Sequence, residues 1–215
     1  MRPDKMTGMP TAGPAELMRA AASFNTKVAA AVQKLGSVKD EDVQIATTPT
    51  DELFRTDKVT LHRYRPLTAR KVQTPLLIAY SLIGRYTMTD LQEDRSLLRN
   101  LLALGVDVYA VDWGSPQRGD RWLTFEDYVD VYLADCVEHI CKTHGIPAVN
   151  LLGICEGGVF SLCYAALYPG RVKNLILTIT PVDFHQDQAE GRKNHGFINL
   201  WTRSLSDEDI ERLIE

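Results

Sequence analysis

The hexapeptide Gly153-Ile154-Cys155-Glu156-Gly157-Gly158 contains the residue types best suited to covalent chemistry in this chain. A short apolar run, Val149–Leu152, precedes it, and a helical pattern, Val159–Tyr168, follows it. This order is typical of a nucleophile elbow, a sharp turn between a strand and a helix that exposes a nucleophilic side chain. Cys155 is the candidate nucleophile, because the positive end of the following helix favours a thiolate over a thiol.

The glycines of the hexapeptide fit the same interpretation. Gly153 and Gly157 lie two residues before and two residues after Cys155, where the strand and the helix cross closely and side chains must be small. Gly158 completes the set of elbow glycines. The alternative interpretation makes Cys155 a small apolar residue in a tight turn, without chemistry. A phosphate-binding loop is excluded, because the spacing is not GxGxxG and no Lys follows.

Backbone N–H groups near the thiol would stabilise an oxyanion. The N–H of Glu156 is one expected donor, since it follows the nucleophile directly. A second donor is expected from Leu82 or Ile83, in the segment Ser81–Gly84 that follows the apolar strand Leu76–Tyr80. An ordinary turn at the end of that strand is the alternative.

The general base and the acid are harder to locate. In this type of site they follow the nucleophile along the chain, and 215 − 155 = 60 residues remain. Asp183, His185 and His195 lie there, but no later strand is evident that would return a histidine to the thiol. We therefore expect the catalytic Asp and His to lie beyond residue 215.

No metal site is expected from the sequence. His139, Cys141 and His144 are the nearest approach to a ligand cluster, but offsets of 2 and 5 residues direct them to different sides of a helix. We interpret them as surface polar residues. Cys136 and Cys163 are expected to face the core as small apolar groups.

Strands and helices alternate in the part of the chain that positions these residues. This pattern, with continuous apolar strands, predicts an α/β fold with a mostly parallel sheet and helices on both faces. Ligands bind at the carboxyl ends of such strands. The expected strands are 58–64 (an edge strand), 76–80, 106–111, 149–152 and 174–180, and the expected helices are 94–104, 124–144 (capped by Thr124) and 159–168.

Composition and charge limit the class of protein. The chain has 215 residues, 45% of them hydrophobic, and a net charge of −4, which argues against a disordered chain and against a nucleic-acid-binding surface. Four cysteines without a CxxC pair suit a reducing compartment. No apolar run is long enough to cross a bilayer, and no signal peptide is evident, so we expect a soluble cytoplasmic protein.

Three regions are predicted along the chain. Residues 1–50 form an N-terminal helical arm and loop, residues 51–187 form the core, and residues 188–215 begin a cap region. The arm contains an amphipathic helix, 15–35, which either packs on the core or binds a partner subunit.

Six further groups of residues form a pattern: 88–90, 92–96, 107–109, 112–114 with 116, 150–155 with 157–158, and 180–184. This pattern resembles the catalytic subunit of class III polyhydroxyalkanoate synthases, in its N-terminal portion. The resemblance extends over residues 57–187 and implies an α/β-hydrolase-type fold, here truncated before its final strands. Two positions depart from the family pattern: Glu156 replaces a neutral residue, and Gly84-Arg85-Tyr86-Thr87 replaces Asn-Arg-Pro-Tyr.

The resemblance implies an acyltransferase that polymerises 3-hydroxyacyl-CoA into polyhydroxyalkanoate. Cys155 would hold the acyl group as a thioester and release coenzyme A, so that no separate cofactor is required. The implied partners are the 3-hydroxyacyl-CoA substrate, the growing polyester chain, a second non-catalytic subunit and further copies of the chain. The implied location is the cytoplasm, at the surface of polyester granules.

Two alternatives compete with polymer synthesis. A Cys-nucleophile hydrolase or thioesterase would use the same elbow but admit water to the acyl-enzyme. A catalytically incomplete fragment would retain only the binding of a partner, in keeping with the absence of a histidine on a final strand.

Overall fold

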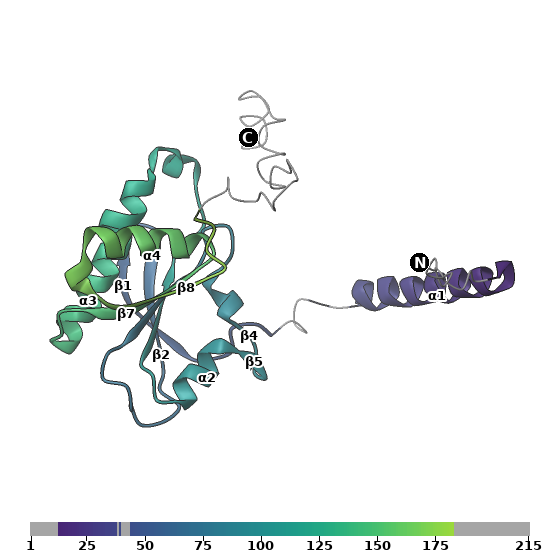
Figure 1. The fold of residues 1–215 in the computed structure, drawn as a ribbon, viewed down its shortest axis with the longest axis horizontal. Coiled ribbons are helices and arrows are strands. Elements are labelled where there is room, and N and C mark those ends of the chain that lie inside the picture. The colour runs from purple at the N-terminus through teal and green to yellow at the C-terminus, as the bar shows by residue number, and fades with distance from the viewer. Residues whose placement is uncertain (1–12, 38, 40–43, 183–215) are drawn as a thin grey trace, which may run out of the picture. The chain divides into compact units, whose positions relative to one another are not determined.

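The computed structural model describes residues 13–37, 39 and 44–182. The chain divides into two compact units, residues 1–44 and residues 45–215 (Figure 1). In the first unit the described structure is dominated by helix α1 (Pro14–Ser37). Its apolar side chains are exposed, among them Leu17, Phe24, Val28 and Leu35.

The second unit is built on a six-stranded sheet with the strand order β1-β2-β6-β3-β7-β8. The four strands β6, β3, β7 and β8 are parallel, whereas β2 runs antiparallel to both β1 and β6. The bounds are β1 (Thr50–Thr56), β2 (Val59–Tyr64), β3 (Leu76–Ala79), β6 (Val108–Asp112), β7 (Val149–Ile154) and β8 (Val172–Thr178).

Helices cover both faces of this sheet, as the alternation of strands and helices predicts. On one face lie α3 (Ala134–His144) and α4 (Glu156–Leu167), and on the other lies α2 (Leu97–Ala103) (Figure 1). Successive residues of the central strands alternate between two apolar clusters, because side chains along a strand point to opposite faces. In β3, for example, Leu77 faces the first cluster and Ile78 the second.

The remaining elements are short and lie in the connections. They are η2 (Tyr86–Thr89), β4 (Asp90–Gln92), β5 (Arg95–Ser96), η3 (Arg118–Trp122), the π-helical stretch η4 (Asp127–Leu133) and η5 (Pro169–Arg171). Strands β4 and β5 form a small antiparallel pair of their own.

One prediction about the elements is wrong. Residues 58–64 do not form an edge strand, because β2 lies between β1 and β6 and is mostly buried. The edge strand is β1, which has the sequence Thr-Asp-Glu-Leu-Phe-Arg-Thr and is largely exposed. Its charged residues interrupt the apolar pattern by which a strand is predicted from sequence. Charged side chains suit an outer strand, since they discourage pairing with further chains.

Candidate active site

Cys155 lies in the sharp turn between β7 and α4, at the carboxyl end of the central strands. Its backbone dihedral angles are φ 56° and ψ −129°, a left-handed conformation that residues other than glycine rarely adopt. Two hydrogen bonds hold the turn: Cys155 N–H donates to Thr178 O at 3.0 Å, and Gly158 N–H donates to Cys155 O at 2.9 Å. The residue is half-buried and packs against the second apolar cluster.

The three elbow glycines occupy positions without room for a side chain. A Cβ atom on Gly157 would meet the backbone oxygens of Ala79 and Tyr80, at the end of β3. Cβ atoms on Gly153 and Gly158 would collide with the α4 backbone and with Thr180, respectively. These close approaches bring the start of α4 directly against the carboxyl ends of β3 and β7.

Two of the three predicted oxyanion donors, the N–H groups of Leu82 and Ile83, already have acceptors. Leu82 N–H donates to Glu156 Oε2 at 3.1 Å, and Ser81 Oγ–H donates to the same oxygen at 3.2 Å. Ile83 N–H donates to Ser81 Oγ at 3.3 Å. The structure therefore brings the segment after β3 and the residue after Cys155 together through the Glu156 side chain.

The four cysteines differ in their surroundings. Burial raises the pKa of Cys136 to about 12 and also raises the pKa of Cys141. Both thiols are therefore neutral and inaccessible at neutral pH, so the expectation of a surface position for Cys141 is wrong. Cys155 and Cys163 are half-buried, and of these two Cys155 lies in the strained turn.

A cavity of about 340 Å³ opens beside the segment that follows β3. Residues 82–87 form one wall and residues 112–116, which follow β6, form the other; Cys155 is not among the lining residues. Trp113 fixes the second wall, because its Nε1–H donates to Tyr80 O at 2.7 Å.

One polar group beside this cavity was not predicted from the sequence. His62 Nε2 lies 3.9 Å from Asp112 Oδ2, and its ring stacks on Tyr86 with centroids 4.9 Å apart. The interaction with His62 and a hydrogen bond from Gly114 N–H hold the pKa of Asp112 below its ordinary value. Antiparallel pairing of β2 with β6 brings these residues together, and no spacing along the chain would reveal it.

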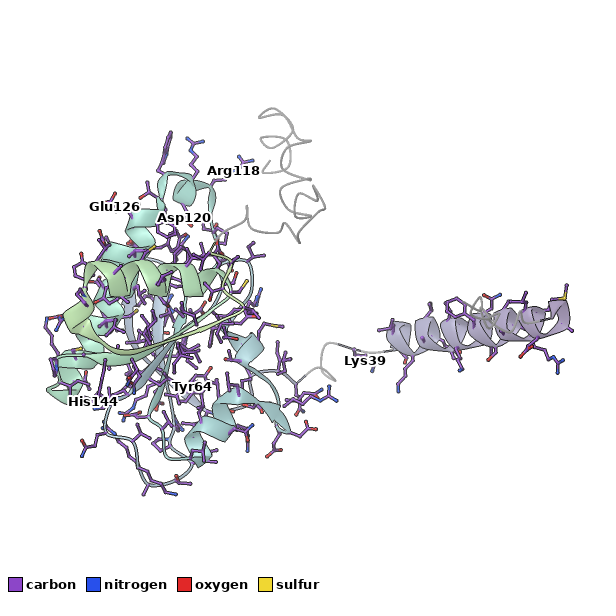
Figure 2. The ribbon with its side chains drawn as sticks, in the orientation of Figure 1. Lys39, Tyr64, Arg118, Asp120, Glu126 and His144 are labelled. Carbon is purple, nitrogen blue, oxygen red and sulfur yellow. The ribbon has the colours of Figure 1, made fainter. Side chains whose placement is uncertain are left out.

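Other predicted or considered residues lie away from Cys155. His144 interacts with Asp107, which precedes β6, and so lies at the amino end of the strands; Figure 2 shows it well separated from Arg118 and Asp120, which follow β6. His139 stacks on Phe54 of β1. Asp183, His185 and His195 fall outside the described residues, as do residues 188–215, the predicted cap.

Within the part of the chain that the structure describes, no hydrogen bond joins Cys155 to a histidine, and no three His, Cys, Asp or Glu residues converge as metal ligands. None of the helices described there is sufficiently long and apolar to span a membrane.

Comparison with protein families gives two matches. A family described as "alpha/beta hydrolase fold" matches residues 74–202, and one described as "Poly-beta-hydroxybutyrate polymerase (PhaC) N-terminus" matches residues 26–101. Solved structures agree on the fold: a candidate lipase from Sulfolobus solfataricus has a TM-score of 0.54 at 18% identity, covering 78% of this chain and 56% of that protein.

Two of the similar sequences share a name. The "Poly(3-hydroxyalkanoate) polymerase subunit PhaC" of a Synechocystis strain is 48% identical over 163 residues, which are 76% of this chain and 43% of that protein. The protein of the same name from Allochromatium vinosum is 43% identical over 186 residues, which are 86% of this chain and 49% of that protein. The chain thus spans less than half the length of these relatives.

Proposed function

Since the chain belongs to the α/β-hydrolase fold family and matches the N-terminal portion of poly(3-hydroxyalkanoate) polymerase subunits, we propose that the intact protein polymerises 3-hydroxyacyl units into polyhydroxyalkanoate. One observation in the structure supports this most directly. The half-buried thiol of Cys155 lies in a left-handed turn at the start of α4, as an acyl-accepting nucleophile requires.

The proposed reaction begins with attack by the Cys155 thiolate on the carbonyl carbon of a 3-hydroxyacyl-CoA thioester. A new carbon–sulfur bond forms, and the carbonyl electron pair moves to oxygen. When the carbonyl re-forms, the bond to coenzyme A breaks, and the released thiolate takes up a proton. Thioester exchange is nearly isoenergetic, so the acyl group on Cys155 stays activated for transfer.

Chain growth follows by attack of a hydroxyl oxygen from another acyl unit on the acyl-enzyme. An ester bond forms and the carbon–sulfur bond to Cys155 breaks. A base takes the hydroxyl proton and passes it to the released Cys155 thiolate. We assign the assisting Asp and His to positions outside the described residues. Coenzyme A acts only as leaving group, and the reaction needs no further cofactor.

Partners and location are part of the same proposal. The intact protein would act with a second, non-catalytic subunit and with further copies of itself, at the surface of cytoplasmic polyester granules. The word "subunit" in the names of the relatives supports a multi-component assembly.

The test is the intact mass of this chain after incubation with 3-hydroxybutyryl-CoA, with Cys155→Ser as the matched control. We expect a mass increase of one 3-hydroxybutyryl group that is absent in the control, together with one equivalent of free coenzyme A. An equal increase in Cys155→Ser would refute the assignment of the nucleophile.

The second stage uses the full-length protein, in which Cys155→Ala should abolish turnover because no acyl-enzyme forms. Accumulation of polymer would support the synthase. Accumulation of free 3-hydroxybutyrate, without polymer, would support the thioesterase alternative instead.

A further inference from the structure

Glu156 connects the elbow to the segment that follows β3. Its Oε2 atom accepts hydrogen bonds from Leu82 N–H at 3.1 Å and from Ser81 Oγ–H at 3.2 Å. Glu156 and its two donors are 74 and 75 residues apart in the chain, so this contact exists only in the folded state. We call residues 81–83 the oxyanion loop, after the donors expected there.

Three polar groups of the oxyanion loop are connected to that one carboxylate oxygen, two of them directly and one through Ser81 Oγ. Leu82 N–H and Ser81 Oγ–H donate to it directly, and Ile83 N–H donates to Ser81 Oγ at 3.3 Å. Consequently neither backbone N–H of the pair Leu82 and Ile83 is left without an acceptor. An acyl oxygen that uses these donors must first replace the carboxylate.

The negative charge of Glu156 makes its replacement by an acyl oxygen unfavourable. A carboxylate accepts stronger hydrogen bonds than a neutral carbonyl oxygen does. It is also a negative charge at the donors that an oxyanion would use, and like charges at short range oppose each other. The half-buried position of Glu156 reduces screening of this repulsion by water.

We propose that Glu156 is a positioning residue that holds the oxyanion loop in a resting arrangement, with its carboxylate in the place of the substrate's acyl oxygen. Acylation of Cys155 then requires the acyl oxygen to displace Glu156 Oε2 from Leu82 N–H. Removing the charge of Glu156 eases this displacement and speeds acylation. The inference rests on the proposed function, because it assumes that Cys155 is acylated.

Two reagents separate the oxyanion from the reactivity of the thiol. With p-nitrophenyl acetate, the Cys155 sulfur forms a bond to the acetyl carbon through an oxyanion and p-nitrophenolate leaves. With iodoacetamide, the sulfur displaces iodide in a single step in which no oxyanion forms. The ratio of the two rates at Cys155, after subtraction of the rates for Cys155→Ala, therefore reports how well the oxyanion is stabilised.

The variants are Glu156→Gln, Ser81→Ala and the control Glu126→Gln. Gln is nearly isosteric with Glu, so Glu156→Gln removes the charge and keeps the shape; Ser81→Ala removes one of the donors to the carboxylate and the acceptor of Ile83 N–H. Glu126 is exposed and lies in the connection before η4, so its substitution makes the same change of net charge elsewhere. Equal urea midpoints would establish that each variant is folded.

We expect the ratio of acylation to alkylation to rise about ten-fold in Glu156→Gln, to rise in Ser81→Ala, and to stay unchanged in Glu126→Gln. A ratio that is unchanged or lower in Glu156→Gln, while the wild-type chain is acylated, would overturn the inference and leave the proposed function intact. Alkylation without acylation in every variant would overturn both.

Discussion

At the scale of single residues, the most informative feature is the backbone of Cys155. A residue other than glycine in such a conformation costs about 1–3 kcal/mol, which the surrounding structure must offset. The hydrogen bonds to Thr178 and Gly158 hold it there. Strain of this kind is found at functional sites, and here it occurs at the candidate nucleophile, between β7 and α4.

Gly157→Ala tests how tightly the elbow is packed. The added Cβ would meet the backbone oxygens of Ala79 and Tyr80, which cannot rotate away as a side chain would. We expect a loss of about 2 kcal/mol in the free energy of unfolding, measured by urea denaturation. Gly119→Ala is the control, because nothing lies within 4 Å of the added atom. Equal urea midpoints for the two variants would contradict the packing described here.

At the scale of elements, the segment that runs from Thr124 to His144 shows what local sequence can and cannot specify. Thr124 caps its start, as the sequence predicts, because Thr124 Oγ1 accepts from Asp127 N–H at 3.3 Å. The structure adds the reciprocal bond, in which Asp127 Oδ2 accepts from Thr124 N–H at 2.7 Å. The π-helical stretch η4 was not predicted. It carries Tyr128 and Tyr132, which bind Lys58 and Asp57 in the turn between β1 and β2.

Ser96→Ala tests the cap of α2, the helix that covers the second face of the sheet. Ser96 Oγ accepts a hydrogen bond from Arg99 N–H at 2.9 Å and is buried. Its removal leaves that N–H without an acceptor, so we expect a loss of about 1 kcal/mol in the free energy of unfolding by urea. Ser115→Ala, at an exposed position, should change it little. An equal effect of both substitutions would argue against the cap.

At the scale of the whole second unit, the two ends of the sheet have different roles. The carboxyl ends of the strands carry Cys155 and the oxyanion loop, whereas the amino ends carry an ion-pair network around Asp107. Arg63 binds this buried carboxylate with two hydrogen bonds, of 3.0 and 2.9 Å. His144 Nε2 lies 3.5 Å from Asp107 and 2.8 Å from Tyr109 Oη. The network joins β2, β6 and the end of α3.

This network predicts a pH dependence of stability. Burial lowers the pKa of His144, and Arg70 and Arg63 oppose its protonation while Asp107 favours it. Because the folded pKa lies below the unfolded pKa of about 6.5, the unfolded chain binds the proton more readily. The contribution of neutral His144 is therefore present above that pH and is lost as the pH falls below it.

The measurement is the urea midpoint at pH 7.5 and pH 5.5 for the wild type and for His144→Gln. We expect the midpoint of the wild type to fall more between these pH values than that of the variant, which cannot be protonated there. The loss of the bond to Tyr109 affects the variant at both pH values, so it cancels in the comparison. An equal fall in both proteins would contradict the role assigned to His144.

The sequence alone determined the fold class and the position of the candidate nucleophile. Both depend on local order along the chain: apolar strands alternate with helices, and Gly153 and Gly157 flank Cys155 between a strand and a helix. The comparisons with known families confirm the fold class and the resemblance to polyhydroxyalkanoate polymerases.

Only the tertiary structure decided which residues distant in the chain meet. Strand order made β1 the edge and buried β2, and antiparallel pairing brought His62 to Asp112. The contact of Glu156 with Leu82 depends on α4 packing against the end of β3, which spacing along the chain does not encode. The hydrogen bonds between elements depend on the order in which the strands pair. The residue pattern within one strand or helix does not identify the elements that will lie beside it.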